Sequence, residues 1–314
     1  MIKIEETTYQ SYGRCVKVSN GSIEVYATLD IGPRLIRFAR VGGENIFCED
    51  LADTSNKSAY AALFREKFGT DHYWHIYGGH RLWTSPEALP RSYYPDNTPV
   101  TYTEIDNGIR LCQPVQAWTQ NQLEIDVVMA PDGNTLDLYH RVYNRGAWPQ
   151  EFAPWCLSVL SAGGKEIIPM PDRSTGLLHN RKIALWEYAR MNDPRVTWGD
   201  KYILLRQDPD AGLEDSFKFG IDSQHGWAAY CNHGDLLVKR FDVVEGGRYP
   251  DDGMCFETYT NGLMLEMESL GVLQTVQPGE CAAHHESLQL IGGVACPPDD
   301  ETEIQKLVDT YINK

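Results

Sequence analysis

The chain has 314 residues, of which 42% are hydrophobic and 23% charged, as in an ordinary globular protein with a sizeable core. Its 28 basic and 44 acidic residues give a net charge of −16, which repels phosphate backbones and anionic lipids and argues against nucleic acid or a membrane surface as partner. No run of about 18 apolar residues occurs, so no membrane-spanning helix is expected.

The N-terminal part of the chain reads mainly as strands. Apolar and polar residues alternate over positions 15–19 and 22–28, and a third strand over 29–38 is broken at Gly32-Pro33. One short helix is predicted over Ser58–Phe68, where aromatic and leucine side chains recur at helical spacing before Gly69. A turn-rich loop follows at Pro90–Pro99.

From Val100 onward the pattern is strand, turn, strand, with a hairpin turn at Asn232-His-Gly-Asp and irregular loops expected over Asp172–Asn192. A final helix is predicted over Asp300–Tyr311, with acidic residues in its first turn and apolar residues on one face. The strands expected in this part cover positions 109–112, 123–129, 135–143, 152–161, 227–231, 236–244, 254–259, 262–270, 273–276 and 283–291.

Strands recur about every eight to twelve residues without long helices between them, which favours an all-β fold over a Rossmann or TIM fold. The chain has no low-complexity linker and no internal repeat. We therefore expect residues 1–314 to form a single domain, a large antiparallel β-sandwich with a few short helices.

The eight cysteines are scattered singly, and none forms a Cys-x-x-Cys pair. This spacing argues against a zinc ribbon or a dithiol redox motif and favours reduced, buried thiols. Residues Met1–Glu6 also lack the apolar run of a secretory signal. We therefore expect a cytoplasmic protein.

Several common site motifs are absent, namely the phosphate-binding patterns Gly-x-x-x-x-Gly-Lys-Ser/Thr and Gly-x-Gly-x-x-Gly and the nucleophile elbow Gly-x-Ser-x-Gly. His72, His75 and His80 match no helical metal-binding spacing, and His72 and His75 would point to opposite faces of a strand. We predict no cofactor and no metal.

The stretch Tyr77–Glu87 combines the residue types that a saccharide site requires. Two glycines allow a tight turn or a close approach to a ligand. They are followed by a titratable ring, a forked cation, a flat apolar face and a carboxylate, namely His80, Arg81, Trp83 and Glu87. The alternative interpretation is that Trp83 belongs to the core and that Arg81 pairs with Glu87.

Glu266 and Glu268 share one face of the strand predicted over residues 262–270. Two like charges facing one pocket disfavour double ionisation, so one pKa should rise, as suits a general acid or base. The alternative is a solvated outer face. Further candidates for substrate binding are Trp155 as a stacking platform, and Lys239 and Glu257 as charged groups.

The segment Leu29–Phe38, followed by Gly42–Phe47, resembles the opening of the galactose mutarotase-like (aldose 1-epimerase) superfamily. Asp137–Gly146 is similar to that family's mid-chain strand ending in Asn-x-Gly, and Leu265–Glu280 is similar to its C-terminal strand and turn. These markers span most of the chain in family order and look closest to an uncharacterised bacterial branch. The resemblance implies a large sandwich whose concave face binds a saccharide.

In mutarotases a late glutamate takes the proton of the anomeric hydroxyl and a histidine delivers one to the ring oxygen. Glu268 falls at the position of that glutamate. The family's two histidines have no clear counterparts in this chain. Where one of them should follow the apolar mid-chain strand, this chain has Trp155-Cys-Leu-Ser. We take Glu268 as the candidate base and His80 as its candidate acid, with Arg81, Trp83, Glu87, Trp155, Lys239, Glu257 and Glu266 as substrate-binding residues.

Three functions therefore stay open. The first is acid–base chemistry on a sugar, as in an aldose-epimerase-like isomerase, and the second is saccharide binding without catalysis. The third is a lyase or hydrolase, whose base would come from Tyr93 or Tyr94 in the loop Pro90–Pro99. In each case the expected partner is a small saccharide.

Overall fold

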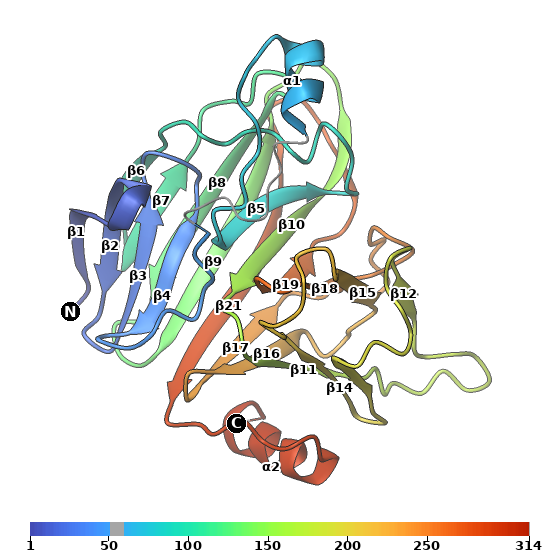
Figure 1. Cartoon of the computed structure of the whole chain (residues 1–314). Helices are drawn as coiled ribbons and strands as arrows, with labels where there is room; N and C mark the ends of the chain where they lie inside the picture. The colour runs from blue at the N-terminus through green and yellow to red at the C-terminus, as the bar shows by residue number, and fades with distance from the viewer. Residues whose placement is uncertain (51–59, 314) are drawn as a thin grey trace.

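Two antiparallel sheets form a sandwich in the computed structural model, which describes residues 1–50 and 60–313 (Figure 1). In the first sheet the strands lie in the order β1 (Lys3–Thr8), β2 (Arg14–Ser19), β3 (Ile23–Thr28), β4 (Leu35–Arg40), β5 (Gly79–Ser85), β10 (Gln150–Leu160), β19 (Leu265–Leu270), β18 (Phe256–Thr260), β15 (Phe217–Ile221) and β12 (Ile183–Leu185), with β20 (Gln274–Val276) paired to β10.

The second sheet contains the remaining strands of the described chain. Their order is β13 (Val196–Trp198), β14 (Tyr202–Arg206), β11 (Lys165–Pro169), β16 (Trp227–Asn232), β17 (Asp235–Phe241), β21 (Cys281–Gly292), β9 (Thr135–Asn144), β8 (Asn121–Met129), β7 (Gly108–Cys112) and β6 (Thr101–Ile105). The all-β sandwich predicted from the strand spacing is thus confirmed. That residues 1–314 behave as one domain stays a prediction.

The main core fills the space between the two sheets. Alternation along each strand sends one set of side chains into this core and the next set to the opposite face. On β19, for example, Leu265 and Met267 are fully buried in the core. Glu266 and Glu268 therefore share the other face of the first sheet, as the sequence predicted, and we call this face the outer face of the first sheet.

Two α-helices and a short 3₁₀ turn, Gln10–Tyr12, complete the described elements. Helix α1 (Ala61–Phe68) ends at Gly69, which adopts a φ of 64° as expected for a helix-terminating glycine. The predicted start of this helix, at residues 58–59, lies outside the described residues. No helix in the described part of the chain has the length and apolarity needed to cross a membrane.

Helix α2 (Glu301–Tyr311) packs on the second sheet, below β11 and β14 in Figure 1. Its apolar face buries Ile304, Leu307 and Val308 against a cluster that includes Tyr202 and Trp227. The Asp300 carboxylate accepts hydrogen bonds from the backbone N–H groups of Thr302 and Glu303, both at 3.0 Å, so it caps the helix.

Replacing Asp300 by Ala should lower the free energy of unfolding by about 1 kcal/mol, because two N–H groups lose their acceptor. Urea titration of both proteins measures this difference. Asp300→Ser is the matched control, because its hydroxyl can accept the same bonds, and it should restore most of the loss. Equal stability of the Ala and Ser variants would contradict the capping role.

Candidate functional site

Neighbouring strands at the centre of the first sheet place aromatic and charged side chains side by side on the outer face. Cross-strand pairing sets Trp83 of β5 opposite Trp155 of β10, and Glu268 of β19 opposite Glu257 of β18. Lys218, on β15, follows one strand further along the sheet. Because side chains opposite each other on one face are in contact, these residues form one continuous surface.

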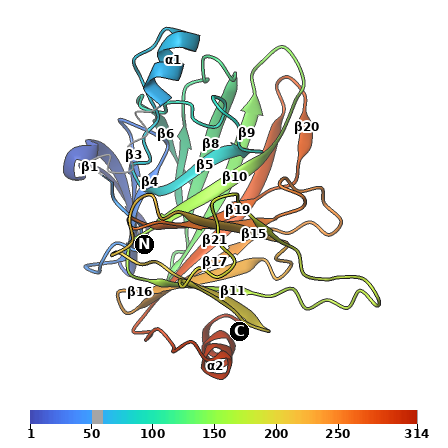
Figure 2. The same ribbon diagram turned by 45° about the vertical axis from the view of Figure 1, so that its right-hand side comes forward.

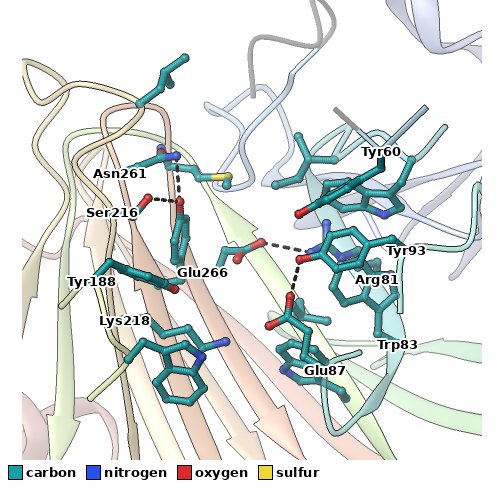
Figure 3. Close-up of a pocket in the computed structure, with 18 of the residues that line it drawn as sticks. Tyr60, Arg81, Trp83, Glu87, Tyr93, Tyr188, Ser216, Lys218, Asn261 and Glu266 are labelled. Atoms are coloured by element: carbon teal, nitrogen blue, oxygen red, sulfur yellow. Dashed lines mark hydrogen bonds and ion pairs between the residues drawn. The ribbon is translucent and has the colours of Figure 1, made fainter. Parts of the chain in front are cut away.

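A cavity of about 470 Å³ opens over this surface, and we call it the aromatic cavity (Figure 3). Its volume lies in the range of small-molecule sites. Among the described residues, eight aromatic side chains line it, together with three glutamates and two cations: Tyr60, Trp74, Trp83, Tyr93, Trp155, Trp186, Tyr188, Tyr259, Glu87, Glu214, Glu266, Arg81 and Lys218.

A second cavity of about 350 Å³ adjoins the first, and we call it the side cavity. Glu257 and Asp251 add carboxylates to its wall. The residues that line both cavities are Tyr60, Glu87, Tyr93, Trp155 and Trp186. The two cavities therefore present one extended, aromatic and acidic surface to a ligand.

Arg81 is held over the aromatic rings of the larger cavity. Its guanidinium carbon lies 4.2 Å from the ring centroid of Trp83 and 4.9 Å from that of Trp74, within the range of cation–π contacts. Its Nη2 atom lies 3.4 Å from Oε1 of Glu266 (Figure 3). The side chain is 2% exposed, and its buried Nε and Nη1 atoms have no hydrogen-bond partner among the described residues.

Lys218 is shared by two buried carboxylates. Its ammonium lies 2.8 Å from Oε2 of Glu257 and 2.9 Å from Oε2 of Glu268, and it sits over the rings of Trp155 and Trp186. Burial opposes the charge of this ammonium, but the two glutamates hold its pKa well above the ordinary value. One ammonium balances one carboxylate, so the second carboxyl group is favoured in its protonated form.

Glu257 is the carboxyl group that keeps the proton. Burial and the neighbouring Glu268 carboxylate raise the pKa of Glu257 to about 8, although Lys218 lowers it. The side chain lines the side cavity, and its Oε1 atom has no hydrogen-bond partner among the described residues. Glu257 therefore carries its proton near neutral pH at the wall of the side cavity.

Glu257→Gln should change how stability depends on pH. The folded-state pKa of Glu257 lies above its unfolded value of 4.5, so the stability that the proton confers is complete below pH 4.5 and is lost as pH rises through about 8. The unfolding free energy of the native protein should therefore fall relative to Glu257→Gln between about pH 5 and pH 8. Denaturant titrations across this range measure the difference, and a flat or rising difference would contradict the assignment.

Glu268 lies on the predicted face but lines neither cavity. It is fully buried, and its Oε2 atom accepts hydrogen bonds from Nε1 of Trp155 and from Lys218, both at 2.9 Å. These bonds fix the indole and the ammonium that do face the cavities. The geometry suits a residue that positions the site more than one that touches a substrate.

The structure does not bring His80 and Glu268 together, in contrast to the predicted acid–base pair. His80 alternates with Arg81 on β5 and therefore points into the space between the sheets, where it is fully buried. Its Nδ1 atom lies 2.9 Å from Oγ of Ser158, and its Nε2 atom lies 2.8 Å from Nε2 of His140. Burial lowers the pKa of His80 well below its ordinary value, so the ring is neutral at pH 7.

Lys239 also lies between the sheets and not at a cavity. Its ammonium forms an ion pair with Oε1 of Glu286 at 2.7 Å and donates to the carbonyl oxygens of Cys156 and Met267. Together with His80, His140 and Ser158 these groups form a buried network, which we call the inter-sheet network. Lys239 is therefore a structural cation, and its predicted place in the substrate site is corrected.

Among the described residues, one group has the spacing of metal ligands, namely His80, His140 and Glu286 of the inter-sheet network. The ammonium of Lys239 already neutralises Glu286 and would repel a metal ion. All three side chains are fully buried: His80 and His140 are hydrogen-bonded to each other, and Glu286 accepts a hydrogen bond from Ser269 besides its ion pair with Lys239. We assign this group a structural role.

The remaining predicted substrate-binding residues do face the cavities. Trp83 and Trp155 are 7% and 3% exposed, so each is both a core residue and part of a cavity wall. Glu87 is exposed at the rim and accepts a hydrogen bond from the hydroxyl of Tyr93, and not from Arg81 (Figure 3). Glu266 lines the aromatic cavity.

Sequence reasoning missed several residues of the cavities. Lys218 sits within Phe217-Lys-Phe-Gly-Ile, where Phe217, Phe219 and Ile221 alternate with other residues and so provide a local strand signal. Trp186 and Tyr188 come from a segment expected to be irregular, in which only the short strand β12 forms. No local pattern marks such residues, because the fold alone brings them to the site.

Solved structures share this fold at low sequence identity. A protein from Klebsiella pneumoniae assigned as an aldose 1-epimerase superposes with a TM-score of 0.61 at 14% identity, over 99% of this chain and 87% of its own. A protein from Salmonella typhimurium assigned as a mutarotase gives 0.57 at 12% identity, over 92% and 94% of the two chains. A galactose mutarotase-like protein from Clostridium acetobutylicum gives 0.53 at 11% identity, over 93% and 99%.

No protein-family model and no curated protein sequence matches the chain. The structural likeness nevertheless extends over almost the whole chain and so includes both of its sheets. The resemblance drawn from the sequence markers is thereby confirmed at the level of the fold. The chain has the galactose mutarotase-like fold.

Proposed function

We propose that this protein binds a saccharide in the aromatic cavity and acts on it by acid–base chemistry, as an aldose-epimerase-like protein. One observation carries the proposal: the outer face of a mutarotase-like sheet bears a cavity walled by aromatic rings and by carboxylates. Aromatic rings stack on the apolar faces of a sugar, and carboxylates and cations bond to its hydroxyls.

The proposed acid is Glu257, whose carboxyl group is protonated near neutral pH and faces the side cavity. The proposed base is Glu266, which faces the aromatic cavity beside Arg81. Because the two strands pair Tyr259 with Glu266 and Glu268 with Glu257, the two carboxyl groups lie diagonally across adjacent strands. A sugar lying between the cavities would have one group on each side.

A second function, saccharide binding without turnover, is favoured by a specific observation. Within the described residues, no histidine lines either cavity, whereas mutarotases use a histidine as the acid. The third function, with Tyr93 or Tyr94 as a base, is disfavoured. Burial and the nearby Glu87 raise the pKa of Tyr93 well above its ordinary value, so its hydroxyl stays protonated, and the Tyr94 hydroxyl accepts a backbone bond from Ala117.

Polarimetry on freshly dissolved aldoses, combined with calorimetry on the same sugars, separates these functions. An acid–base isomerase should bind at least one aldose and speed the approach to its equilibrium rotation. A sugar-binding protein should bind and leave that rate unchanged. Neither binding nor acceleration across a broad panel of mono- and disaccharides would refute both.

A further inference from the structure

Two cysteines far apart in the sequence meet beside the C-terminal helix, away from the aromatic cavity. Cys231 lies on β16 and is 2% exposed, and Cys296 lies exposed in the segment between β21 and α2. Each thiol influences the pKa of the other. Both line a cavity of about 320 Å³ that also contains Lys165, Arg206 and His233.

Strand pairing, a backbone hydrogen bond and a side-chain ion pair hold the two cysteines in this position. Lys165 of β11 is the direct cross-strand partner of Cys231. On the other side, the ammonium of Lys165 lies 2.8 Å from Oδ1 of Asp299, and the N–H of Val294 donates to the carbonyl of Gly234 at 3.0 Å. The segment that carries Cys296 is therefore anchored to the second sheet on both sides of the thiol.

The surroundings of the pair make the two thiols unequal. The neighbouring Cys231 thiol, aided by the positive charge of Lys165, lowers the pKa of Cys296 to about 6. The neighbouring Cys296 and burial together raise the pKa of Cys231. An exposed thiolate next to a buried thiol is the arrangement of an attacking cysteine with a resolving partner.

We propose that Cys296 and Cys231 form a dithiol site that hydroperoxides oxidise to a disulfide. The thiolate of Cys296 attacks one oxygen of the hydroperoxide, so the O–O bond breaks, an alkoxide leaves and Cys296 becomes a sulfenic acid. The sulfur of Cys231 then attacks the sulfenic sulfur, the S–O bond breaks, and hydroxide leaves with the thiol proton as water. The two electrons lost by the sulfurs reduce the O–O bond.

The disulfide would join β16 covalently to the segment that leads into α2. In the reduced protein this segment is held by noncovalent contacts such as the Lys165–Asp299 ion pair, and α2 is held by its apolar face. Oxidation therefore ties α2 to the second sheet, and a thiol reductant reverses it. The singly scattered cysteines gave no sign of this pair, because only the fold brings them together.

The test treats the reduced, full-length protein with hydrogen peroxide at pH 6, followed by alkylation and peptide mass analysis. The expected product is a peptide pair cross-linked through Cys231 and Cys296, formed about tenfold faster than Cys112 is oxidised. Cys281→Ser is the matched control and should cross-link like the native protein.

Two variants locate the reactive thiol. Cys296→Ser removes an exposed side chain and should leave Cys231 reduced, whereas Cys231→Ala should leave Cys296 as a sulfenic acid that a 1,3-dicarbonyl reagent traps. Should Cys231→Ala fail to fold, trapping at early times in the native protein gives the same information. Oxidation of Cys112 before the pair, or unchanged peroxide reactivity of Cys296→Ser, would overturn the proposal.

Discussion

Replacing Lys239 by Met should destabilise the protein by about 3–5 kcal/mol at neutral pH. Lys239 and Glu286 are both fully buried and 2.7 Å apart, so the substitution leaves a buried carboxylate without its cation. Saccharide binding should change little, because Lys239 lies between the sheets and lines neither cavity. Denaturant titration and calorimetry measure the two effects on the same protein.

The matched control for this prediction is the double variant Lys239→Met with Glu286→Gln. Gln carries no charge, so the double variant should recover part of the stability that the single variant loses. Loss of saccharide binding with unchanged stability in Lys239→Met would restore the lysine to the substrate site. The inter-sheet network would then lose its structural role.

Glu257→Gln should lower turnover of the bound sugar by about 10²–10⁴-fold while leaving its binding largely intact. Gln keeps the shape of the side chain but cannot deliver a proton to the substrate. The rate of the native protein should also fall as pH rises through about 8, where Glu257 loses its proton. Polarimetry, corrected for the uncatalysed reaction at each pH, measures both.

Glu214→Gln is the control for turnover, because Glu214 lines the aromatic cavity but is exposed at its rim. Its turnover should stay within a few-fold of the native rate. An unchanged rate in Glu257→Gln would remove Glu257 from the chemistry, even if the cavity binds sugar. Equal losses in both variants would indicate a general effect of cavity charge.

Much of the fold followed from the sequence because alternation and turn residues are local signals. The hairpin at Asn232–Asp235 forms with His233 and Gly234 at positive φ. Glu266 and Glu268 share a face because side chains alternate between the two faces of a strand. The same rule, applied to Gly79–Ser85, separates His80 from Arg81. His80 therefore lies between the sheets and Arg81 lines the aromatic cavity, although both belong to the same glycine-rich stretch.

The rest of the site could not be predicted, because it depends on contacts between distant parts of the chain. The pairing of Glu257 with Glu268 requires the register of β18 against β19. The position of Lys218 between these carboxylates requires the neighbouring strand β15. Figure 2 shows β19 and β15 crossing the middle of the molecule below β10.

The most direct test is a crystal structure of the protein soaked with a panel of saccharides. The account predicts a sugar in the aromatic cavity or across both cavities, with its ring against Trp155 or Trp186 and a hydroxyl or ring oxygen within hydrogen-bond distance of Glu257 or Glu266. A saccharide bound only at another surface, with both cavities free of sugar, would contradict it.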